Sequence, residues 1–419
     1  MAQDAAAVPR RTAAGEGRCD VVTATARGRA VPPRSHPALR AALALVCLCV
    51  ALIVGEAAAR WWWTPPPWFA ALGPAGLCVT AADGDVVLQP GFRGAPSGDG
   101  DTAIAVNSLG MRGPEPGPKA AGDRRLLVLG DTVVLGAGVG WEETFVARLS
   151  GRLSTDTTSW LAGNGGVPGH GSTHAAAHMA RLDAPFGADA CVVCGSLGDD
   201  ALDDAAPERV VHAGLLLQGP WARLVRSSLR ARLLCRSRAA LWLECALPAA
   251  DAATDLPARL LDLAAAGEAS IAFPPQRLAD GLFLDAVDEG AAWDAGAPPL
   301  IARSLATLRG ALERMRGQAD GRPLVFVVVP TLWQVVEEHR VARLRERGID
   351  PTTTERGLAQ RRWLDTAKSA GVQALDATPI LAAAPDPAAM FLAAGRHFAA
   401  AGHEAVTAWL AQELARRWR

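Results

Sequence analysis

Apolar and polar positions along the chain predict strands that alternate with helices. Branched apolar residues fill 126–129 and stop at Gly130-Asp131, which predicts a buried parallel strand ending in a tight turn. Further strands are expected at 190–194, 323–329 and 372–375. Helices are expected at 142–153, 172–183, 301–317, 334–348, 354–371 and 402–417, with Ser172 or Thr173 capping the second. This alternation predicts an α/β fold, a parallel sheet covered on both faces.

Residues 205–300 lack this alternation. Helical patterns are predicted around 221–247 and 256–265, with loops after them. We interpret the stretch as an insertion or subdomain of the main domain, which spans 122–419. Before that domain, 61–121 is rich in Pro and Gly and contains short strand-like pieces at 86–88 and 103–106.

One segment near the N-terminus is apolar enough to cross a membrane. Ala41 to Ala59 contains about the number of apolar residues that a bilayer requires, and Arg40 and Arg60 bound it. Basic residues gather before the segment and Trp61-Trp62-Trp63 follows it, which predicts a cytoplasmic N-terminus and an extracytoplasmic main domain. We therefore expect a disordered tail at 1–39 and an anchor at 40–60. A cleaved signal peptide is the alternative, because small residues follow Glu56.

Charge and composition narrow the classes of partner. The 419 residues contain 42 Lys+Arg and 43 Asp+Glu, a formal charge of −1, which gives no reason to expect a nucleic acid. Tyrosine is absent, so any aromatic ligand contact must come from Trp or Phe. No cofactor is indicated.

Five of the eight cysteines fall outside the tail and the apolar segment, and this odd number excludes a complete disulfide framework. Cys235 with Cys245 is the one candidate bridge. Cys191 and Cys194 have the spacing of a redox or zinc motif. They fall on a predicted strand, where residues three apart face opposite sides, so we expect two small buried side chains.

Four short blocks resemble those of the SGNH/GDSL hydrolases. They are Gly130-Asp131-Thr132, Asn164 to Gly169, Gly198-Asp199-Asp200, and His397 with Gly402-His403 before the last helix. The resemblance implies a flavodoxin-like three-layer sandwich. It also implies a nucleophile at Thr132, a base at His397, an oxyanion donor at Gly169, and a pocket that includes Asp131, Asn164 and Asp199.

Three of these positions depart from the family pattern. Thr132 replaces the nucleophilic serine, and its extra methyl crowds the line of attack. A cap for the next turn is the alternative role of Thr132. Asp199 replaces an asparagine, and a carboxylate cannot donate to an oxyanion, a loss of roughly 10²–10³ in rate. Gly395 and Ala394 fall where the orienting aspartate is expected, and losing that group costs about 10⁴. Asp386 lies eleven residues before His397 and would need an unusual loop to take the place of that aspartate.

The segment Asn107 to Gly113 resembles one that precedes the first block in membrane-anchored members of the group, where we expect a hairpin or flap against the sheet. Some of those members resemble polysaccharide O-acetyltransferases. The implied ligand is therefore an acyl ester of envelope carbohydrate, with an envelope protein as a further partner. Two hypotheses remain: a membrane-anchored esterase or acyltransferase with impaired catalysis, and a pseudoenzyme that binds carbohydrate or serves assembly.

Other motifs carry weaker signals. Ser196 nearly completes a Gly-x-Ser-x-Gly motif, but the first glycine is Cys194. His174 and His178 lie four residues apart near His170, which suits either surface histidines or a metal site, although no further ligand is evident. Gly136 to Gly140 follows a strand but lacks the spacing of a dinucleotide loop.

Overall fold

The computed structural model describes residues 36–63, 75–94, 102–198, 200–205, 208–218, 220–246, 299–346, 350–393 and 395–418. The chain divides into two compact units, Met1–Gly55 and Glu56–Arg419. The expected tail lies outside the described residues except for its last four positions, as does the helix expected at 256–265. The expected boundary at residue 121 stays a prediction.

Helix α1, Pro37–Trp62, contains the expected apolar segment. It is 26 residues long, and its mean hydropathy reaches 2.5. At 1.5 Å per residue its length exceeds the ~30 Å of a bilayer core. Among the described residues it is the one helix that is long and apolar enough to span a membrane.

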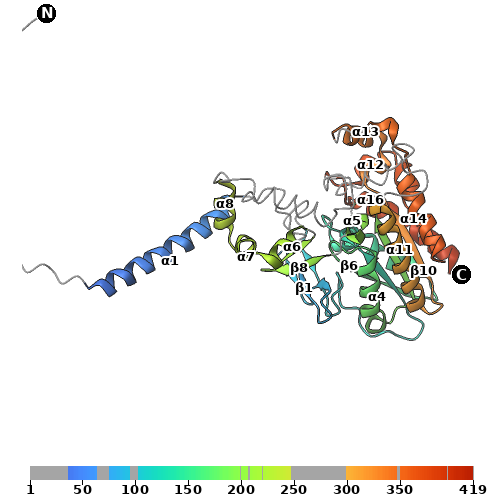
Figure 1. Ribbon diagram of the computed structural model, residues 1–419. Coiled ribbons are helices and arrows are strands. Elements are labelled where there is room, and N and C mark those ends of the chain that lie inside the picture. Colours follow the sequence, from blue (N-terminus) through green and yellow to red (C-terminus); the bar gives the residue numbers. More distant parts are fainter. Residues whose placement is uncertain are drawn as a thin grey trace, which may run out of the picture. The chain divides into compact units, whose positions relative to one another are not determined.

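The second unit contains a five-stranded parallel sheet (Figure 1). Its strands are β5 (Arg124–Gly130), β6 (Trp160–Gly166), β7 (Ala190–Ser196), β10 (Leu324–Val329) and β11 (Gln373–Asp376). Their spatial order is β11-β10-β7-β5-β6. When the five strands are numbered along the chain and the order is read from β6, it is 2-1-3-4-5. This is the flavodoxin-like order, so the predicted fold class is confirmed.

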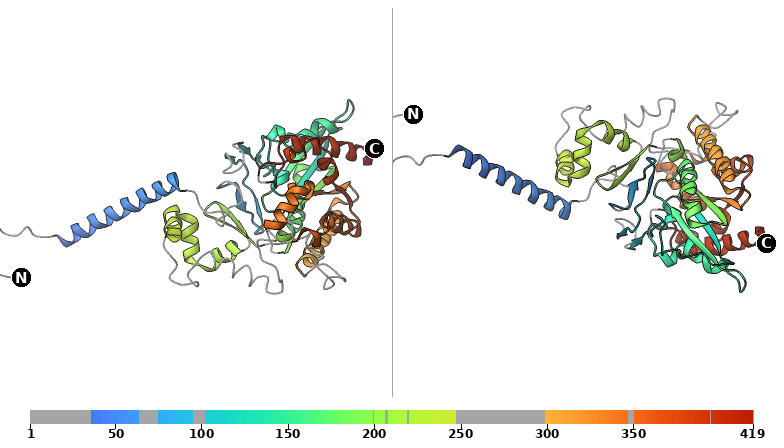
Figure 2. Two further views of the ribbon diagram at one scale, coloured as in Figure 1. Left: turned by 90° about the horizontal axis from the view of Figure 1, so that it is seen from above. Right: turned by 90° about the horizontal axis from the view of Figure 1, so that it is seen from below.

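Helices cover both faces of this sheet, as Figure 2 shows from two further sides. One face packs against α4 (Ser172–Phe186), α11 (Pro299–Ala319) and α14 (Leu358–Ser369). The other packs against α3 (Phe145–Leu153) and α16 (Ala400–Arg417). Because alternate strand residues point to opposite faces, Cys191 joins the first core and Cys194 the second, as expected.

Several expected helices are broken in the structure. Thr144 separates a 3-10 turn, η1 (Trp141–Glu143), from α3, because its hydroxyl accepts from the Ala147 N–H and caps the second piece. Ser172 does not cap α4, since its side chain donates to Asp204. The helices expected at 334–348 and 221–247 also divide. The pieces are α12 (Leu332–Val335), α13 (Glu337–Glu346), α6 (Pro220–Ser227), α7 (Leu229–Arg236) and α8 (Arg238–Ala246).

Short elements surround the sheet. Three antiparallel pairs are β1 (Cys78–Thr80) with β2 (Val86–Leu88), β3 (Arg93–Gly94) with β4 (Ile104–Ala105), and β8 (Arg209–His212) with β9 (Leu215–Gln218). The remaining helical turns are α2 (Thr132–Leu135), α5 (Asp200–Ala205), η4 (Pro351–Thr353), α15 (Thr378–Ala382) and η5 (Ala388–Met390). The described part of 205–300 contributes to a small apolar core, and its description as an insertion or subdomain stays a prediction. Within it, Cys235 is a free thiol, so the expected bridge to Cys245 is wrong.

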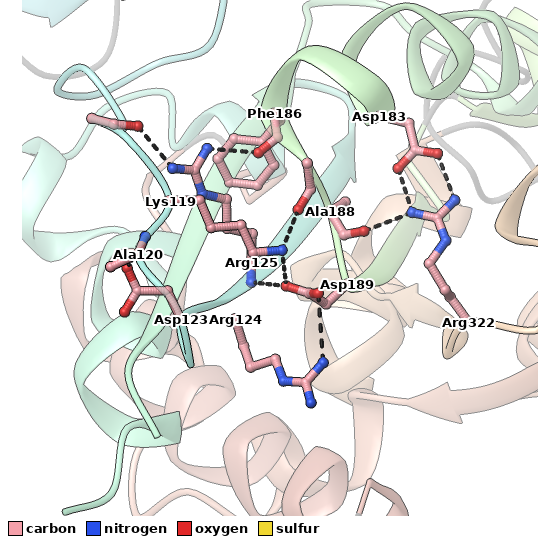
Figure 3. A network of polar contacts seen from close by, with 12 residues as sticks. Lys119, Ala120, Asp123, Arg124, Arg125, Asp183, Phe186, Ala188, Asp189 and Arg322 are labelled. Atoms are coloured by element: carbon pink, nitrogen blue, oxygen red, sulfur yellow. Dashed lines mark hydrogen bonds and ion pairs between the residues drawn. The ribbon is translucent and has the colours of Figure 1, made fainter. Parts of the chain in front are cut away.

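Ionic contacts fasten the amino ends of the strands (Figure 3). The Asp189 carboxylate, just before β7, accepts from the Arg125 N–H and from Lys119, each at 2.7 Å. Just before β10, Arg322 forms a two-pronged pair with Asp183 at the end of α4. Paired, partly buried charges of this kind hold neighbouring strands in register at the edge opposite the predicted site.

Candidate active site

The turn after β5 presents Thr132 at the carboxyl edge of the sheet. β5 ends at Gly130, and the single-turn helix α2 begins two residues later. The buried Asp131 carboxylate accepts from the Val133 N–H at 2.8 Å and caps this helix. The cap therefore belongs to Asp131 and not to Thr132. The Thr132 hydroxyl is left half-buried at the first helical position.

Two glycines let the turn fold back onto the strand ends. A Cβ at Gly130 would lie 2.9 Å from the Cys194 carbonyl oxygen, and one at Gly166 would lie 2.2 Å from the Leu135 nitrogen. Real Cβ atoms do not approach a backbone that closely. These positions therefore require glycine for α2 to sit against β6 and β7.

His397 reaches Thr132 from a hairpin-like loop near the C-terminus. Phe391 and Phe398 form a bridge across this loop, and the Leu392 N–H donates to the His397 carbonyl at 2.9 Å. The imidazole Nε2 of His397 lies 3.0 Å from Thr132 Oγ1. This is hydrogen-bond distance, and it is the separation that a nucleophile and its general base require.

Gly395 occupies a conformation that an aspartate would adopt only with strain. Its φ is +73°, and a Cβ there would lie 3.2 Å from the Leu332 Cβ. Its carbonyl accepts from the Leu332 N–H at 2.8 Å, so the loop is pinned at this point. Asp386 does not substitute: its exposed carboxylate bonds to the N–H groups of Ala388 and Ala389, and not to the imidazole. Ala394 lies outside the described residues.

The second block joins the first at the ends of β5 and β6. The Val167 N–H donates to the Gly130 carbonyl at 3.0 Å, and the His170 N–H closes a turn onto the Val167 carbonyl at 3.1 Å. Gly169, with φ +67°, takes the left-handed position that such a turn needs after Pro168. Gly169 is buried, and no acceptor for its N–H is found among the described residues.

Asn164 lies beneath the turn and not in the opening. Its side chain is fully buried, its amide donates to the Val134 carbonyl at 2.7 Å, and its oxygen accepts from the Gly166 N–H at 3.0 Å. It therefore supports α2 from below. The place given to Asn164 in the pocket lining does not match this geometry.

The third block follows β7. Asp199 lies outside the described residues, whereas its neighbour Asp200 accepts from the Ser196 N–H at 2.8 Å. Ser196 is buried and its hydroxyl accepts from the Gly198 N–H, which does not suit a nucleophile. Burial, with the charges of Asp131 and Asp200, raises the pKa of the Cys194 thiol. Their hydrogen bonds to Val133 and Ser196 place these two carboxylates at the ends of β5 and β7.

Arg112 is a functional candidate that the sequence analysis did not single out. Its buried guanidinium donates to the carbonyls of Leu135 at 2.7 Å, Gly136 at 2.6 Å and Val139 at 2.7 Å. The first two carbonyls lie at the C-terminal end of α2, where a cation is favourable, and the third belongs to the turn that follows. Burial lowers the pKa of Arg112 to about 10. The segment Asn107 to Gly113 does lie against the sheet, since Arg112 bridges to Asn164 on β6.

The imidazole rings of the histidines near α4 pack against one another. His170 and His178 are buried, their ring centroids are 5.4 Å apart, and His174 stacks on His170 at 5.4 Å, so these are not surface histidines. No group of three metal-ligating side chains is found within the described ranges. His403 is also buried and joins α16 to α3, because its Nδ1 accepts from the Phe145 N–H at 3.3 Å.

No protein-family model and no curated protein matches the sequence of this chain. Solved structures that are similar include a lipase/acylhydrolase from Enterococcus faecalis, at 11% identity and a TM-score of 0.36, covering 70% of this chain and 96% of that one. Est24, a carbohydrate acetylesterase from Sinorhizobium meliloti, is 10% identical with a TM-score of 0.33, covering 70% and 99%.

A catalytic mutant of Axe2, an acetylxylan esterase from Geobacillus stearothermophilus, is 12% identical with a TM-score of 0.35, covering 70% of this chain and 94% of that one. The strands of the sheet follow the parallel order given above, and the first, second and fourth blocks meet at one edge of that sheet. By these features the chain has the α/β fold of the SGNH/GDSL hydrolases.

Proposed function

We propose that the chain is a membrane-anchored acyl-ester hydrolase or acyltransferase that works slowly on acetylated envelope carbohydrate outside the cytoplasm. The observation that carries this proposal is the 3.0 Å separation of Thr132 Oγ1 and His397 Nε2. Thr132 lies near the start of the domain's sequence and His397 near its end. A hydrogen bond between a hydroxyl and an imidazole is the contact that acyl transfer needs.

The reaction follows from the positions of the two side chains. His397 Nε2 takes the proton of Thr132 as Oγ1 attacks the acyl carbon, and a tetrahedral oxyanion forms. The N–H groups of Thr132 and Gly169 are the candidate donors to that oxyanion. The imidazolium then returns the proton to the leaving sugar oxygen. Water, or a second hydroxyl, resolves the acyl-threonine through the same base.

Two features support slow turnover. The Thr132 methyl restricts the attacking hydroxyl. Asp199 replaces a donor, which costs roughly 10²–10³ in rate. The α1 helix supports the anchoring, and the order of basic residues and tryptophans around it supports the orientation.

The test is ester turnover by the full-length protein in detergent micelles. Initial rates on p-nitrophenyl acetate and on acetylated xylo-oligosaccharide are compared for wild type, Thr132→Ala and His397→Ala. We expect each variant to lose roughly 10²–10⁴-fold. The exposed residues Thr157 and His339 give matched controls, Thr157→Ala and His339→Ala, which should keep the wild-type rate. Equal rates in all five proteins would refute the enzymatic proposal.

The second candidate is a pseudoenzyme that binds carbohydrate esters, which Asp199 at the asparagine position and Gly395 at the aspartate position favour. Calorimetry with acetylated xylo-oligosaccharide separates the two. Binding that persists in Thr132→Ala, together with turnover that this variant leaves unchanged, would assign the pocket to recognition alone.

A further inference from the structure

Exposed apolar side chains gather on α7 and α8. Outside α1, the large hydrophobic side chains that the described residues expose are Leu229, Leu233, Trp242 and Leu243, and Leu229 is 80% exposed. All four belong to these two short helices. Such a concentration marks a surface that is covered in the working state of the protein.

These helices are tied to the end of α1. The Glu56 carboxylate accepts from the Ser237 hydroxyl at 2.7 Å and from the N–H groups of Arg238 and Ala239, which caps α8. The Arg60 side chain donates to the Arg236 carbonyl at 3.2 Å. Glu56 lies near the C-terminal end of the apolar stretch Ala41 to Ala59. If α1 spans a membrane, as the proposed function holds, these contacts join α7 and α8 to the part of α1 that leaves the bilayer.

The side chains around this point match the chemistry of a bilayer surface. Trp61 and Trp62 are 85% and 83% exposed, and tryptophan favours the headgroup region. Between residues 220 and 246, the one acidic residue is Glu244. The basic residues of that stretch are Arg223, Arg226, Arg230, Arg232, Arg236 and Arg238.

A cavity of about 450 Å³ combines both kinds of side chain. Leu229, Leu233 and two valines form its apolar lining, whereas His212, Arg226, Arg232 and Arg236 supply the polar part. None of the described residues that line it carries a carboxylate. Arginine binds phosphate through paired N–H groups, and the leucines suit the glycerol and upper acyl region of the same lipid. Arg226 and Arg232 also donate to the backbone carbonyls of Arg209, Val225 and Arg226, whereas the Arg236 side chain donates to no carbonyl among the described residues. Arg236 is therefore the principal candidate for a lipid phosphate.

We propose that α7 and α8 dock on the surface of an anionic phospholipid bilayer, with the leucines entering the headgroup boundary and the arginines binding lipid phosphates. A second copy of the chain is a poorer occupant, because a symmetric contact would bring arginine against arginine. This proposal rests on the anchoring in the proposed function and not on the catalytic part.

Hydrogen exchange of the full-length protein in lipid nanodiscs tests the proposal. Amide exchange of residues 226–246 is compared between discs of phosphatidylcholine and discs containing a quarter phosphatidylglycerol. We expect the anionic lipid to slow exchange severalfold. Each arginine near an anionic surface contributes about fivefold in affinity, so Arg236→Gln should remove a matching part of the protection.

Two further variants sharpen the comparison. The double change Leu229→Ser with Leu233→Ser should abolish the lipid-dependent protection, since both side chains are exposed and their loss leaves the small core intact. Arg314 is an exposed arginine on α11, and Arg314→Gln should leave the protection unchanged.

Three outcomes would overturn the proposal. Exchange that is equal in both kinds of disc shows that anionic lipid is not bound. Protection that rises with protein concentration in detergent assigns the surface to a second copy or another protein. Equal losses in Arg236→Gln and Arg314→Gln show a non-specific charge effect. Membrane anchoring is measured separately, by the co-elution of every variant with the disc. Ester turnover is measured in its own assay, so a failure of the proposed function is distinguished from a failure of the lipid proposal.

Discussion

Thr132 Oγ1 and His397 Nε2 lie 3.0 Å apart, although 265 residues separate them in the sequence. The hydroxyl stands on the first turn after β5, and the imidazole stands on a loop that is pinned to α12 through the Gly395 carbonyl. Hydrogen bonds hold both supports in place. The pair is therefore set before any ligand arrives, which is the condition for a positioned base.

Replacing Thr132 by serine should increase turnover. Serine keeps the hydroxyl and removes the methyl that restricts χ1, so Thr132→Ser should raise kcat by about 3- to 10-fold. Initial rates on p-nitrophenyl acetate measure the change. A lower kcat in a folded Thr132→Ser protein would show that the methyl helps to hold the hydroxyl against His397.

Gly166→Ala should disturb the site and the fold together. The added methyl would lie 2.2 Å from the Leu135 nitrogen, so α2 must move, at a cost of at least about 1–3 kcal/mol in the free energy of unfolding. Gly151 is the control, because an added methyl there meets nothing within 4 Å. Gly151→Ala on helix α3 should be neutral or up to about 1 kcal/mol more stable. Urea unfolding distinguishes them, and equal midpoints would contradict the close contact.

Arg112 should affect kcat more than KM. It holds the carbonyl end of α2 while Thr132 begins the same turn, so Arg112→Lys should shift the hydroxyl without removing a ligand contact. A lysine cannot reach three carbonyls at once. We expect kcat to fall about 100-fold and stability by about 2–4 kcal/mol. An unchanged kcat in a protein with lowered stability would leave Arg112 a structural residue only.

Asp204 should make stability depend on pH. Burial raises its pKa from 3.8 to about 7, against the hydrogen bonds that Ser172 donates. The folded state therefore favours the protonated form. This contribution is present below pH 3.8 and is lost as the pH rises towards about 7.

Asp204→Asn removes the titration but keeps an oxygen for the Ser172 N–H. We expect its stability minus that of wild type to become more favourable between pH 4 and about 7, by an amount on the order of a few kcal/mol. Urea unfolding at each pH gives the difference. A difference that does not change over this range would show that Asp204 is ionised in the folded protein.

Strong local patterns made much of the sheet predictable. β5 and β10 are runs of branched apolar residues, and their position between helices fixes a parallel arrangement. The opposite faces of Cys191 and Cys194 follow from strand geometry alone and are confirmed. The approach of His397 to Thr132 was accessible only through the resemblance, because no local rule relates residues so far apart.

Contacts between residues far apart in the sequence determine the features that the sequence did not predict. Arg112 has the residue type of a surface position, but its guanidinium is buried because it donates to the carbonyls of Leu135 and Val139. Asn164 suits a pocket by type, yet β6 places it on the inner side of the turn. The histidines of α4 could face either way by pattern, and the structure buries His178 with its ring against that of His170.

The ionic contacts around Asp189 and Arg322 bear on how the domain tolerates change. They hold the sheet at the edge away from Thr132 and His397. Substitutions at those two positions are therefore expected to leave the framework of the domain folded, whether or not ester chemistry survives them.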